Sequence, residues 1–299
     1  MSSNDDKSAT LYILGKYDCP RVTHCQAIVS DVIAKIGSIQ KTEFITCFET
    51  EFDSYRDELL KDNKEFIDFT QSPLIYLVYP NNSKKIIGSL EEFRTYIIEN
   101  YNYHDVRQTV DFEEETKRNL KDFLENNGNK YVYFNFDIDG EKPNYEKVIL
   151  EIFEKDCPLT SENFIELCKG FTNNKGQKIS YNNSIIHRVS KNSFIQGGDI
   201  KLDGDHSIYG PNFNDENYTV KHNSKGILGM VKKGGRNHTN ESQFYITLCP
   251  LESFDGKFVA FGRVIQGYET IKAIGNLETD LQRPKQRVYV KECGEYKIE

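Results

Sequence analysis

Cys19 is the first residue of the chain whose position suggests chemistry. It follows the apolar run TLYIL at 10–14 and a Gly-Lys-Tyr-Asp stretch, and it stands directly before Pro20. Proline suits the first position of a helix, so we expect Cys19 at the helix cap, where a thiol pKa is lowered. The next cysteine, Cys25, would lie about 240° around that helix and face away. The sequence predicts either single-thiol chemistry at Cys19 or a fold that is kept as a binding or spacing module.

The other cysteines and the paired glycines predict no metal or cofactor site. The seven cysteines are an odd number, are widely spaced and include no Cys-x-x-Cys pair, so we expect free thiols. Gly197-Gly198 and Gly234-Gly235 are interpreted as turn glycines, because neither pair stands between a strand and a helix as a phosphate-binding loop would.

Charge separates the chain into two parts. The 299 residues predict two domains, and the net charge of -8 falls entirely within residues 1–128. An acidic domain argues against nucleic acid and favours a basic protein partner. No apolar run approaches the ~18 residues of a membrane span. The first ten residues, MSSNDDKSAT, lack the pattern of a secretory signal. We therefore expect a cytoplasmic location and no membrane association.

The N-terminal part is predicted to alternate strands and helices. The expected strands are 10–14, 41–48, 72–79 and 84–88, and the expected helices are 20–36, 52–66 and 89–101, the last capped by Ser89. An amphipathic helix after Asp111, with acids in its first turn and Gly128 at its end, is interpreted as a linker.

This order of elements resembles the thioredoxin and glutaredoxin fold. The resemblance rests on the order and on two positions, Cys19-Pro20 and Ser72-Pro73, and it implies a cis peptide bond before Pro73. The redox motif of that family is Cys-Pro-x-Cys, and here Val22 stands in its fourth position. The expected boundaries are a tail at 1–8, a thioredoxin-like domain at 9–105, a helical linker at 106–129 and a second domain at 130–299.

The second domain is predicted to be mainly β. Two strands, YVYFNFDID and KVILEIF, are joined by a turn at 140–144 and followed by a helix that ends at Gly170. Further short strands are predicted at SIIHRV, FIQGGD, GILGM, SQFYITL, FVAFGRV and RVYVKEC, with one more helix at YETIKAIGNL. So many strands with only two helices favour a closed or orthogonally packed barrel.

Six motifs of this domain resemble the cyclophilins, the cyclosporin-binding family of peptidyl-prolyl cis-trans isomerases. They are, in order, IIHRV, FIQGGD, SIYGPNFNDENY, KGILGM, SQFYIT and FDGKFVAFGRVIQG. The resemblance implies an eight-stranded antiparallel barrel with two helices behind an α/β thioredoxin-like domain. The presence of that preceding domain, together with the motifs KHNSKG and QFYITL of the second domain, resembles the isomerase-like-six subgroup of the family. The association of that subgroup with ciliated cells implies an axonemal microtubule assembly as a partner.

The family's reaction is rotation about X–Pro peptide bonds of polypeptides. Amide resonance sets a barrier of ~18 to 20 kcal/mol, and lowering it needs no nucleophile, metal or cofactor. An enzyme must hold the proline ring in an apolar pocket, anchor the neighbouring carbonyl and bind the twisted form better than the planar one. The resemblance makes Arg188 the catalytic residue and places substrate contacts at Gln196, Gln243, Tyr245 and Phe254.

The chain departs from the family pattern at this site. Where the family has Phe then Met before the glutamine, this chain has Ser193 and Phe194. Val231 and Lys232 replace Ala-Asn, a two-residue insertion follows, and Phe258 replaces a histidine. These residues are expected to line the substrate site with an altered shape and to reduce isomerase activity.

Ser253 stands where the family has the tryptophan that grips cyclosporin, in a chain with no tryptophan. Loss of so large an aromatic anchor removes about 2 to 4 kcal/mol of binding, so weak cyclosporin binding is expected.

Other interpretations remain open. The cyclophilin fold could be a binding module docked in a larger assembly with little turnover, or the chain could be a glutaredoxin-like thiol enzyme with an attached isomerase. Arg188 could be a barrel-surface salt-bridge partner, His187 is interpreted as a core histidine, and Lys232-Lys233 as a solvated loop pair.

Overall fold

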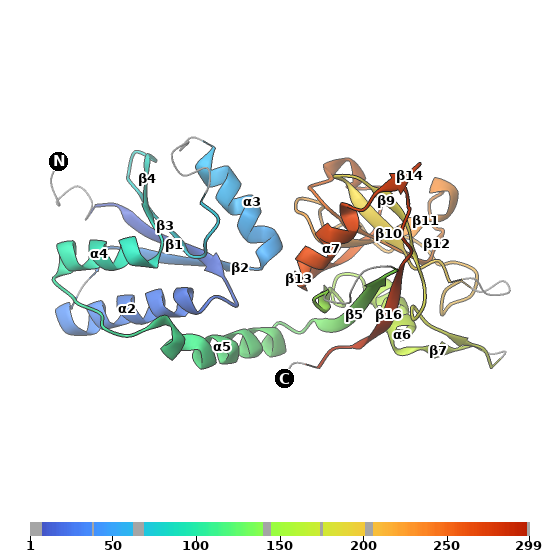
Figure 1. Cartoon of the computed structure of the whole chain (residues 1–299), viewed down its shortest axis with the longest axis horizontal. Helices are drawn as coiled ribbons and strands as arrows, with labels where there is room; N and C mark the ends of the chain where they lie inside the picture. Colours follow the sequence, from blue (N-terminus) through green and yellow to red (C-terminus); the bar gives the residue numbers. More distant parts are fainter. Residues whose placement is uncertain are drawn as a thin grey trace. The chain divides into compact units, whose positions relative to one another are not determined.

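The structure is a computed structural model that describes residues 8–37, 39–61, 69–139, 145–173, 176–200 and 206–297. Most of the expected tail and the expected turn at 140–144 therefore lie outside the described residues. The chain divides into two compact units between Asn126 and Asn127 (Figure 1).

The first unit contains a four-stranded mixed sheet in the order β2-β1-β3-β4. Strands β1 and β2 are parallel, whereas the other two pairs are antiparallel. The strands are β1 (Thr10–Lys16), β2 (Thr42–Cys47), β3 (Leu74–Val78) and β4 (Lys84–Gly88). The helices are α2 (Pro20–Ile36), α3 (Glu49–Leu60), α4 (Leu90–Tyr101), η2 (Thr109–Phe112) and α5 (Glu113–Asn126). This is the arrangement expected of a thioredoxin-like α/β fold.

Helices cover both faces of this sheet. Because successive side chains of a strand point to opposite faces, Ile75 and Leu77 of β3 join the apolar cluster under α2 and α4. Leu74 and Tyr76 join a second cluster under α3. Helix α2 begins at Pro20 as expected, and Cys19 is its N-cap.

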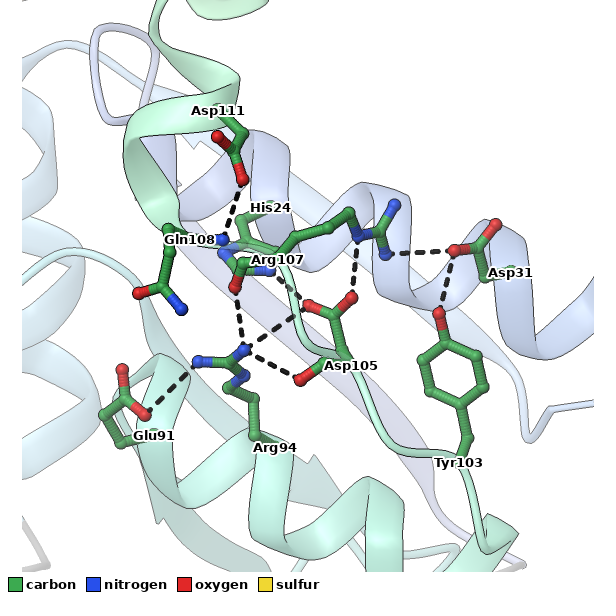
Figure 2. A network of polar contacts seen from close by, with 9 residues as sticks. All are labelled: His24, Asp31, Glu91, Arg94, Tyr103, Asp105, Arg107, Gln108 and Asp111. Atoms are coloured by element: carbon green, nitrogen blue, oxygen red, sulfur yellow. Dashed lines mark hydrogen bonds and ion pairs between the residues drawn. The ribbon is translucent and has the colours of Figure 1, made fainter.

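A polar network ties the segment after α4 to helix α2 (Figure 2). The carboxylate of Asp105 contacts the buried imidazole of His24 and accepts a hydrogen bond of 2.6 Å from Nε of Arg107. Arg94 donates to the backbone carbonyls of Asp105 and Arg107, and a second nitrogen of Arg107 lies 2.9 Å from the carboxylate of Asp31. The segment that carries Asp105 and Arg107 is thus held by contacts with His24 and Asp31 of α2 and with Arg94 of α4.

The helix expected as a linker packs within the first unit. Thr116 at the start of α5 and Thr23 of α2 are joined by a buried hydrogen bond of 2.6 Å between their hydroxyls. Farther along α5, the ring of Phe123 stacks on Tyr17 with centroids 4.4 Å apart. Helix α5 therefore covers the region just before Cys19.

The second unit is built on an eight-stranded antiparallel sheet that closes on itself. Its order is β16-β5-β6-β13-β11-β12-β10-β9, and a bridge between Ile185 and Tyr289 joins the two edges. The strands are β5 (Lys130–Ile138), β6 (Val148–Ile152), β9 (Ile186–Ser190), β10 (Phe194–Gly197), β11 (Ile227–Lys232), β12 (Asn240–Thr247), β13 (Ala260–Gln266) and β16 (Val288–Glu295).

Two helices and short segments complete this unit. They are α6 (Pro158–Lys169), α7 (Tyr268–Gly275), η3 (Lys233–Gly235), η4 (Glu252–Phe254) and the strand pairs β7 (Phe171–Thr172) with β8 (Lys178–Ile179) and β14 (Thr279–Asp280) with β15 (Arg283–Pro284). The expected combination of a thioredoxin-like α/β unit and a cyclophilin barrel is confirmed. No helix among the described residues is both long and apolar enough to span a bilayer.

Alternation along the strands decides which side chains can form a site. Val189, Ile195 and Phe244 point inward and are fully buried in the barrel core. The residues beside them in sequence therefore face outward from three neighbouring strands, β9, β10 and β12.

Candidate active site

Arg188 is held by contacts from three sides. It is the exposed residue of β9 directly opposite Gln196 of β10. Its Nε donates a hydrogen bond of 2.6 Å to Oε1 of Gln282, and its Nη1 donates one of 3.4 Å to Oε1 of Gln196. The guanidinium also lies over the ring of Phe194, 5.1 Å from its centroid. The expected catalytic arginine is thus oriented by hydrogen bonds while part of it remains open to solvent.

The two glutamines continue the polar row across the sheet. Nε2 of Gln196 donates to Oε1 of Gln243 on β12 over 2.9 Å. Gln196 is buried and Gln243 is half-buried. The three sequence-predicted polar residues therefore form one hydrogen-bonded row, from Arg188 through Gln196 to Gln243.

Four aromatic side chains gather beside this row, and we call them the aromatic cluster: Phe194, Tyr245, Phe254 and Phe258. The ring of Tyr245 meets that of Phe254 edge-on at 5.4 Å and that of Phe258 at 6.0 Å. Phe194 closes the group at 5.7 Å from Phe254. The shift of one position between Ser193 and Phe194 leaves an aromatic ring here, because Phe194 reaches both Arg188 and Phe254.

Lys232 is buried, so its interpretation as part of a solvated loop pair is wrong. Its ammonium group lies 2.9 Å from the carboxylate of Asp215, and both side chains are only 2% exposed. Lys232 also donates to the hydroxyl of Tyr218 and to Oδ1 of Asn237, and it lies 5.8 Å from the ring centroid of Phe258. The ammonium group of Lys232 thus points into the protein toward Asp215, a partner that the sequence around Lys232 does not indicate.

Asp215 is kept ionised by its surroundings. Burial pushes the pKa of this carboxyl up, but hydrogen bonds from Lys232, the backbone of His238, Tyr218 and Asn240 outweigh burial, and the pKa lies below its usual value. Asp215 therefore carries its negative charge at the edge of the site, 2.9 Å from Nζ of Lys232.

A pocket of about 540 Å³ adjoins the polar row. Val231 and Lys232 lie on its wall together with Arg188, Gln196, Gln243, Asp199, His206, Lys233, Gly234, Gly235 and Glu241. Lys233 is exposed and pairs with Glu241 at 2.8 Å. The structure thus brings all nine residues expected at the isomerase site to the row, the aromatic cluster or this pocket.

His187 takes no part in the row. Its Nδ1 is buried and has no hydrogen-bond partner among the described residues. Burial lowers the pKa of His187 below its ordinary value, so the ring is neutral at pH 7. Proton transfer is not required for rotation about a peptide bond.

Four residues with contacts at the site were not predicted from the sequence: Asp215, Gln282, His222 and Asp255. Gln282 lies at the tip of the β14–β15 hairpin, and Asp255 and His222 lie in loops. Loop residues carry no periodicity. The only sequence signal for Asp255, His222 and Asp215 was their place within FDGKFVAFGRVIQG, KHNSKG and SIYGPNFNDENY, and Gln282 lies in none of the quoted motifs.

Cys19 belongs to the first unit, where it is the N-cap of α2. Its Sγ donates to the backbone carbonyl of Ser72 over 3.2 Å, and the Ser72–Pro73 peptide bond is cis as expected. Cys25 is fully buried in the apolar cluster under α2, and burial raises its pKa well above the ordinary value. A buried neutral thiol cannot readily serve as a resolving partner for Cys19.

Comparison with known proteins identifies relatives of the second unit. Residues 133–295 match the family model described as cyclophilin type peptidyl-prolyl cis-trans isomerase/CLD. A protein of Mus musculus named "Probable inactive peptidyl-prolyl cis-trans isomerase-like 6" is 38% identical over 67% of the chain and 64% of its own length. Its Homo sapiens counterpart of the same name is 36% identical over 71% of the chain and 68% of its own length.

A third relative bears the name of an isomerase without the qualification. "Peptidyl-prolyl cis-trans isomerase cyp11" of Rhizopus delemar is 39% identical over 56% of the chain and 50% of its own length. The matches thus span about half to two thirds of each relative.

Proposed function

Because the chain belongs to the family of cyclophilin-type peptidyl-prolyl cis-trans isomerases, we propose that it catalyses rotation about X–Pro bonds of polypeptides, with reduced activity. The observation that carries the proposal is the hydrogen-bonded row of Arg188, Gln196 and Gln243 beside the aromatic cluster. A charge, two backbone anchors and an apolar surface are the groups that this reaction needs.

The proposed mechanism is stabilisation of the twisted peptide bond. The proline ring packs on the aromatic cluster, and the amides of Gln196 and Gln243 bind the peptide backbone. Arg188 then places its guanidinium near the imide nitrogen, where a lone pair develops as resonance is lost. Each group binds the twisted form better than the planar form, which is how binding lowers a barrier.

Three features support reduced rather than full activity. The Lys232–Asp215 pair fills the wall where the family has Ala-Asn. Phe258 lies 4.7 Å from Phe254 and narrows the apolar surface, in a position where the family has a histidine. Relatives from mouse and human carry the words "probable inactive" in their names.

Those names favour a second candidate function. In it, the cyclophilin unit is a binding module that recognises proline-containing segments and turns over slowly or not at all. The acidic first unit would then bind a basic protein partner, and an axonemal microtubule assembly in a cilium is the proposed setting, with the cytoplasm as the alternative. A thiol enzyme is disfavoured, because Cys25 is buried and Val22 replaces a resolving cysteine.

The experiment that separates the two functions is NMR exchange spectroscopy on an Ala-Pro peptide, with wild-type protein and Arg188→Ala. The matched control is Arg287→Ala, an exposed arginine of the same unit that lies over the ring of Tyr289. We expect wild type and the control to accelerate exchange and Arg188→Ala to abolish the acceleration. Equal activity of Arg188→Ala would refute the assignment, and no activity in wild type would favour the binding module.

A further inference from the structure

The hydroxyl of Tyr245 is enclosed behind the aromatic cluster. Tyr245 is 2% exposed, and its hydroxyl lies 2.6 Å from Nε2 of His222. The ring also lies against Gly229 of β11, where a Cβ atom would overlap both its hydroxyl and its Cζ. The phenol oxygen therefore points away from the proposed substrate surface, and only the apolar ring faces it.

His222 is itself fixed by a second partner. It is completely buried, and Oδ1 of Asp255 lies 2.8 Å from its Nδ1 and 2.9 Å from its backbone nitrogen. An ionised carboxylate can only accept, so the proton of the neutral ring belongs on Nδ1. Nε2 then accepts the hydrogen bond of the Tyr245 hydroxyl. The hydrogen bonds therefore run from Tyr245 to His222 and from His222 to Asp255.

The charges around His222 maintain this arrangement. Burial lowers the pKa of His222, the hydrogen bond and the charge of Asp255 oppose that effect only in part, and Lys221 lowers the pKa further. Burial also raises the pKa of Tyr245 well above its ordinary value, so the phenol keeps its proton. Asp255 stays ionised because the hydrogen bonds from His222 outweigh the effect of its burial.

This chain of hydrogen bonds joins separate parts of the site. Asp255 belongs to the turn at 252–258, which carries Phe254 and Phe258 on either side of it. The turn's own hydrogen bonds are local, such as Phe258 N to the carbonyl of Phe254. His222 also accepts at its carbonyl from the backbone of Leu251, so this residue links the turn to Tyr245 on β12.

We propose that His222 and Asp255 are positioning residues for the isomerase site, acting through Tyr245 and through the turn that carries Phe254 and Phe258. The proposal rests on the proposed function for its meaning, since it concerns the surface that would receive the proline ring. It assigns no proton transfer to the three groups; they set the relative position of three aromatic rings.

Protonation of His222 would disrupt the arrangement. With both ring nitrogens protonated, Nε2 becomes a donor, and the hydroxyl of Tyr245 must find another acceptor in a space closed by Gly229. Asp255, Tyr245 and Lys221 are the titratable groups that act on this ring. Affinity for a proline peptide should therefore fall on acidification, and it should do so through Tyr245.

The test compares Tyr245→Phe with wild type between pH 5 and 8. Two quantities are measured by NMR: the Kd for an Ala-Pro peptide and the amide shifts of Phe254 and Phe258. At pH 7.5 we expect Tyr245→Phe to weaken binding about tenfold, the effect of one lost hydrogen bond. The acid-induced shift changes of the two amides should shrink in the variant, because ring position no longer depends on His222.

Two further variants separate positioning from general damage. Asp255→Asn keeps an acceptor for Nδ1 and should stay within about twofold of wild type in Kd, whereas Asp255→Ala should lose affinity as Tyr245→Phe does. Tyr268→Phe is the matched control, because Tyr268 is a buried tyrosine whose hydroxyl donates to the carbonyl of Leu248. Tyr268→Phe should lower the unfolding free energy and leave the Kd for the peptide unchanged.

The outcomes distinguish this proposal from the function on which it rests. A wild type that binds the peptide without accelerating exchange contradicts catalysis and leaves the positioning test in force. If no peptide binds, the proposal is tested by the acid-induced changes in the amide shifts of Phe254 and Phe258, which should be smaller in Tyr245→Phe than in wild type. Unchanged shifts, Kd and pH profile in Tyr245→Phe would overturn the proposal.

Discussion

Gln282 accepts a hydrogen bond of 2.6 Å from Nε of Arg188, although 94 positions separate them in the chain. The backbone carbonyl of Gln282 also accepts from the amide of Val189 over 2.7 Å. Gln282 and Leu281 have positive φ angles of 70° and 45°. Such turns usually hold Asn-Gly, because most side chains are disfavoured at positive φ. The hairpin therefore keeps an unfavourable residue at the point where its side-chain amide reaches Arg188.

Replacing Gln282 with glycine should separate activity from stability. Gln282→Gly removes the amide that holds Arg188 but fits the positive φ, so the unfolding free energy should stay within about 1 kcal/mol of wild type. Exchange on the Ala-Pro peptide should slow about fivefold to tenfold, the equivalent of one hydrogen bond. Leu281→Ala is the control, since Leu281 is 96% exposed in the same turn. Unchanged exchange in Gln282→Gly would show that Arg188 is oriented without it.

The origin of the two partners explains what the sequence could predict. Arg188 and Gln196 are eight positions apart on adjacent strands of one hairpin, so local spacing alone brings them opposite each other. Gln282 and His222 reach the site from loops, and their contacts depend on closure of the barrel. The burial of Lys232 depends in the same way on Asp215, because a lysine pair in a polar stretch ordinarily indicates a solvated loop.

The order of elements was predictable because it rests on local patterns. Alternating strands and the Ser89 cap follow from neighbouring residues, and both are present in the structure. The packing of α5 on α2 was not predictable, since it depends on the contact of Thr116 with Thr23 and of Phe123 with Tyr17. A charged helix between two domains gives no local sign of which surface it covers.

Breaking the Lys232–Asp215 pair should destabilise the cyclophilin unit. Lys232→Met leaves a buried carboxylate without its cation, which costs about 3 kcal/mol when both groups are desolvated. Adding Asp215→Asn to Lys232→Met should restore a large part of the lost unfolding free energy, because no unpaired buried charge then remains. Urea unfolding of the single and double variants measures both effects. The assignment of Lys232 and Asp215 as a buried ion pair would be contradicted if Lys232→Met left the unfolding free energy unchanged, or if the effects of the two substitutions were additive.

The stability of the cyclophilin unit should decrease below about pH 6.5. Burial lowers the pKa of both His187 and His222 in the folded state. Between the folded and unfolded pKa values the unfolded chain binds more protons, so the unfolding free energy rises with pH. The stabilisation is fully present above the unfolded pKa and is lost as the pH falls through the folded values. Asp215 and Asp255, whose pKa values are lowered, add losses only at more acidic pH.

Urea unfolding at pH 7.5 and pH 5, followed by amide signals of β9 and β12, checks this prediction. Strand β9 carries His187, and strand β12 carries Tyr245, whose hydroxyl contacts His222. A flat unfolding free energy across this range would mean that the two histidines titrate alike in both states.

Cyclosporin should bind poorly. Ser253 is exposed and small, and it cannot replace an indole that both packs and donates a hydrogen bond. Affinity should be on the order of 30- to 1000-fold weaker than in family members with the tryptophan, and Ser253→Trp should recover part of it. Calorimetric titration of both proteins measures the difference, and nanomolar binding by the unmodified chain would contradict the mapping of this turn.

Oxidation should leave Cys19 without an internal disulfide. Cys19 is half-buried at the start of α2, so a small thiol reagent can reach it. Cys25 is completely buried, and its raised pKa disfavours the thiolate that exchange requires. Treatment with oxidised glutathione followed by mass spectrometry under non-reducing conditions should therefore show at most one mixed disulfide in the first unit, at Cys19, since the other half-buried thiol, Cys249, belongs to the second unit. Cys19→Ser should abolish it, and Cys25→Ser should leave it unchanged. A stoichiometric bond between Cys19 and Cys25, opened and re-formed by glutathione, would instead make the first unit a dithiol enzyme.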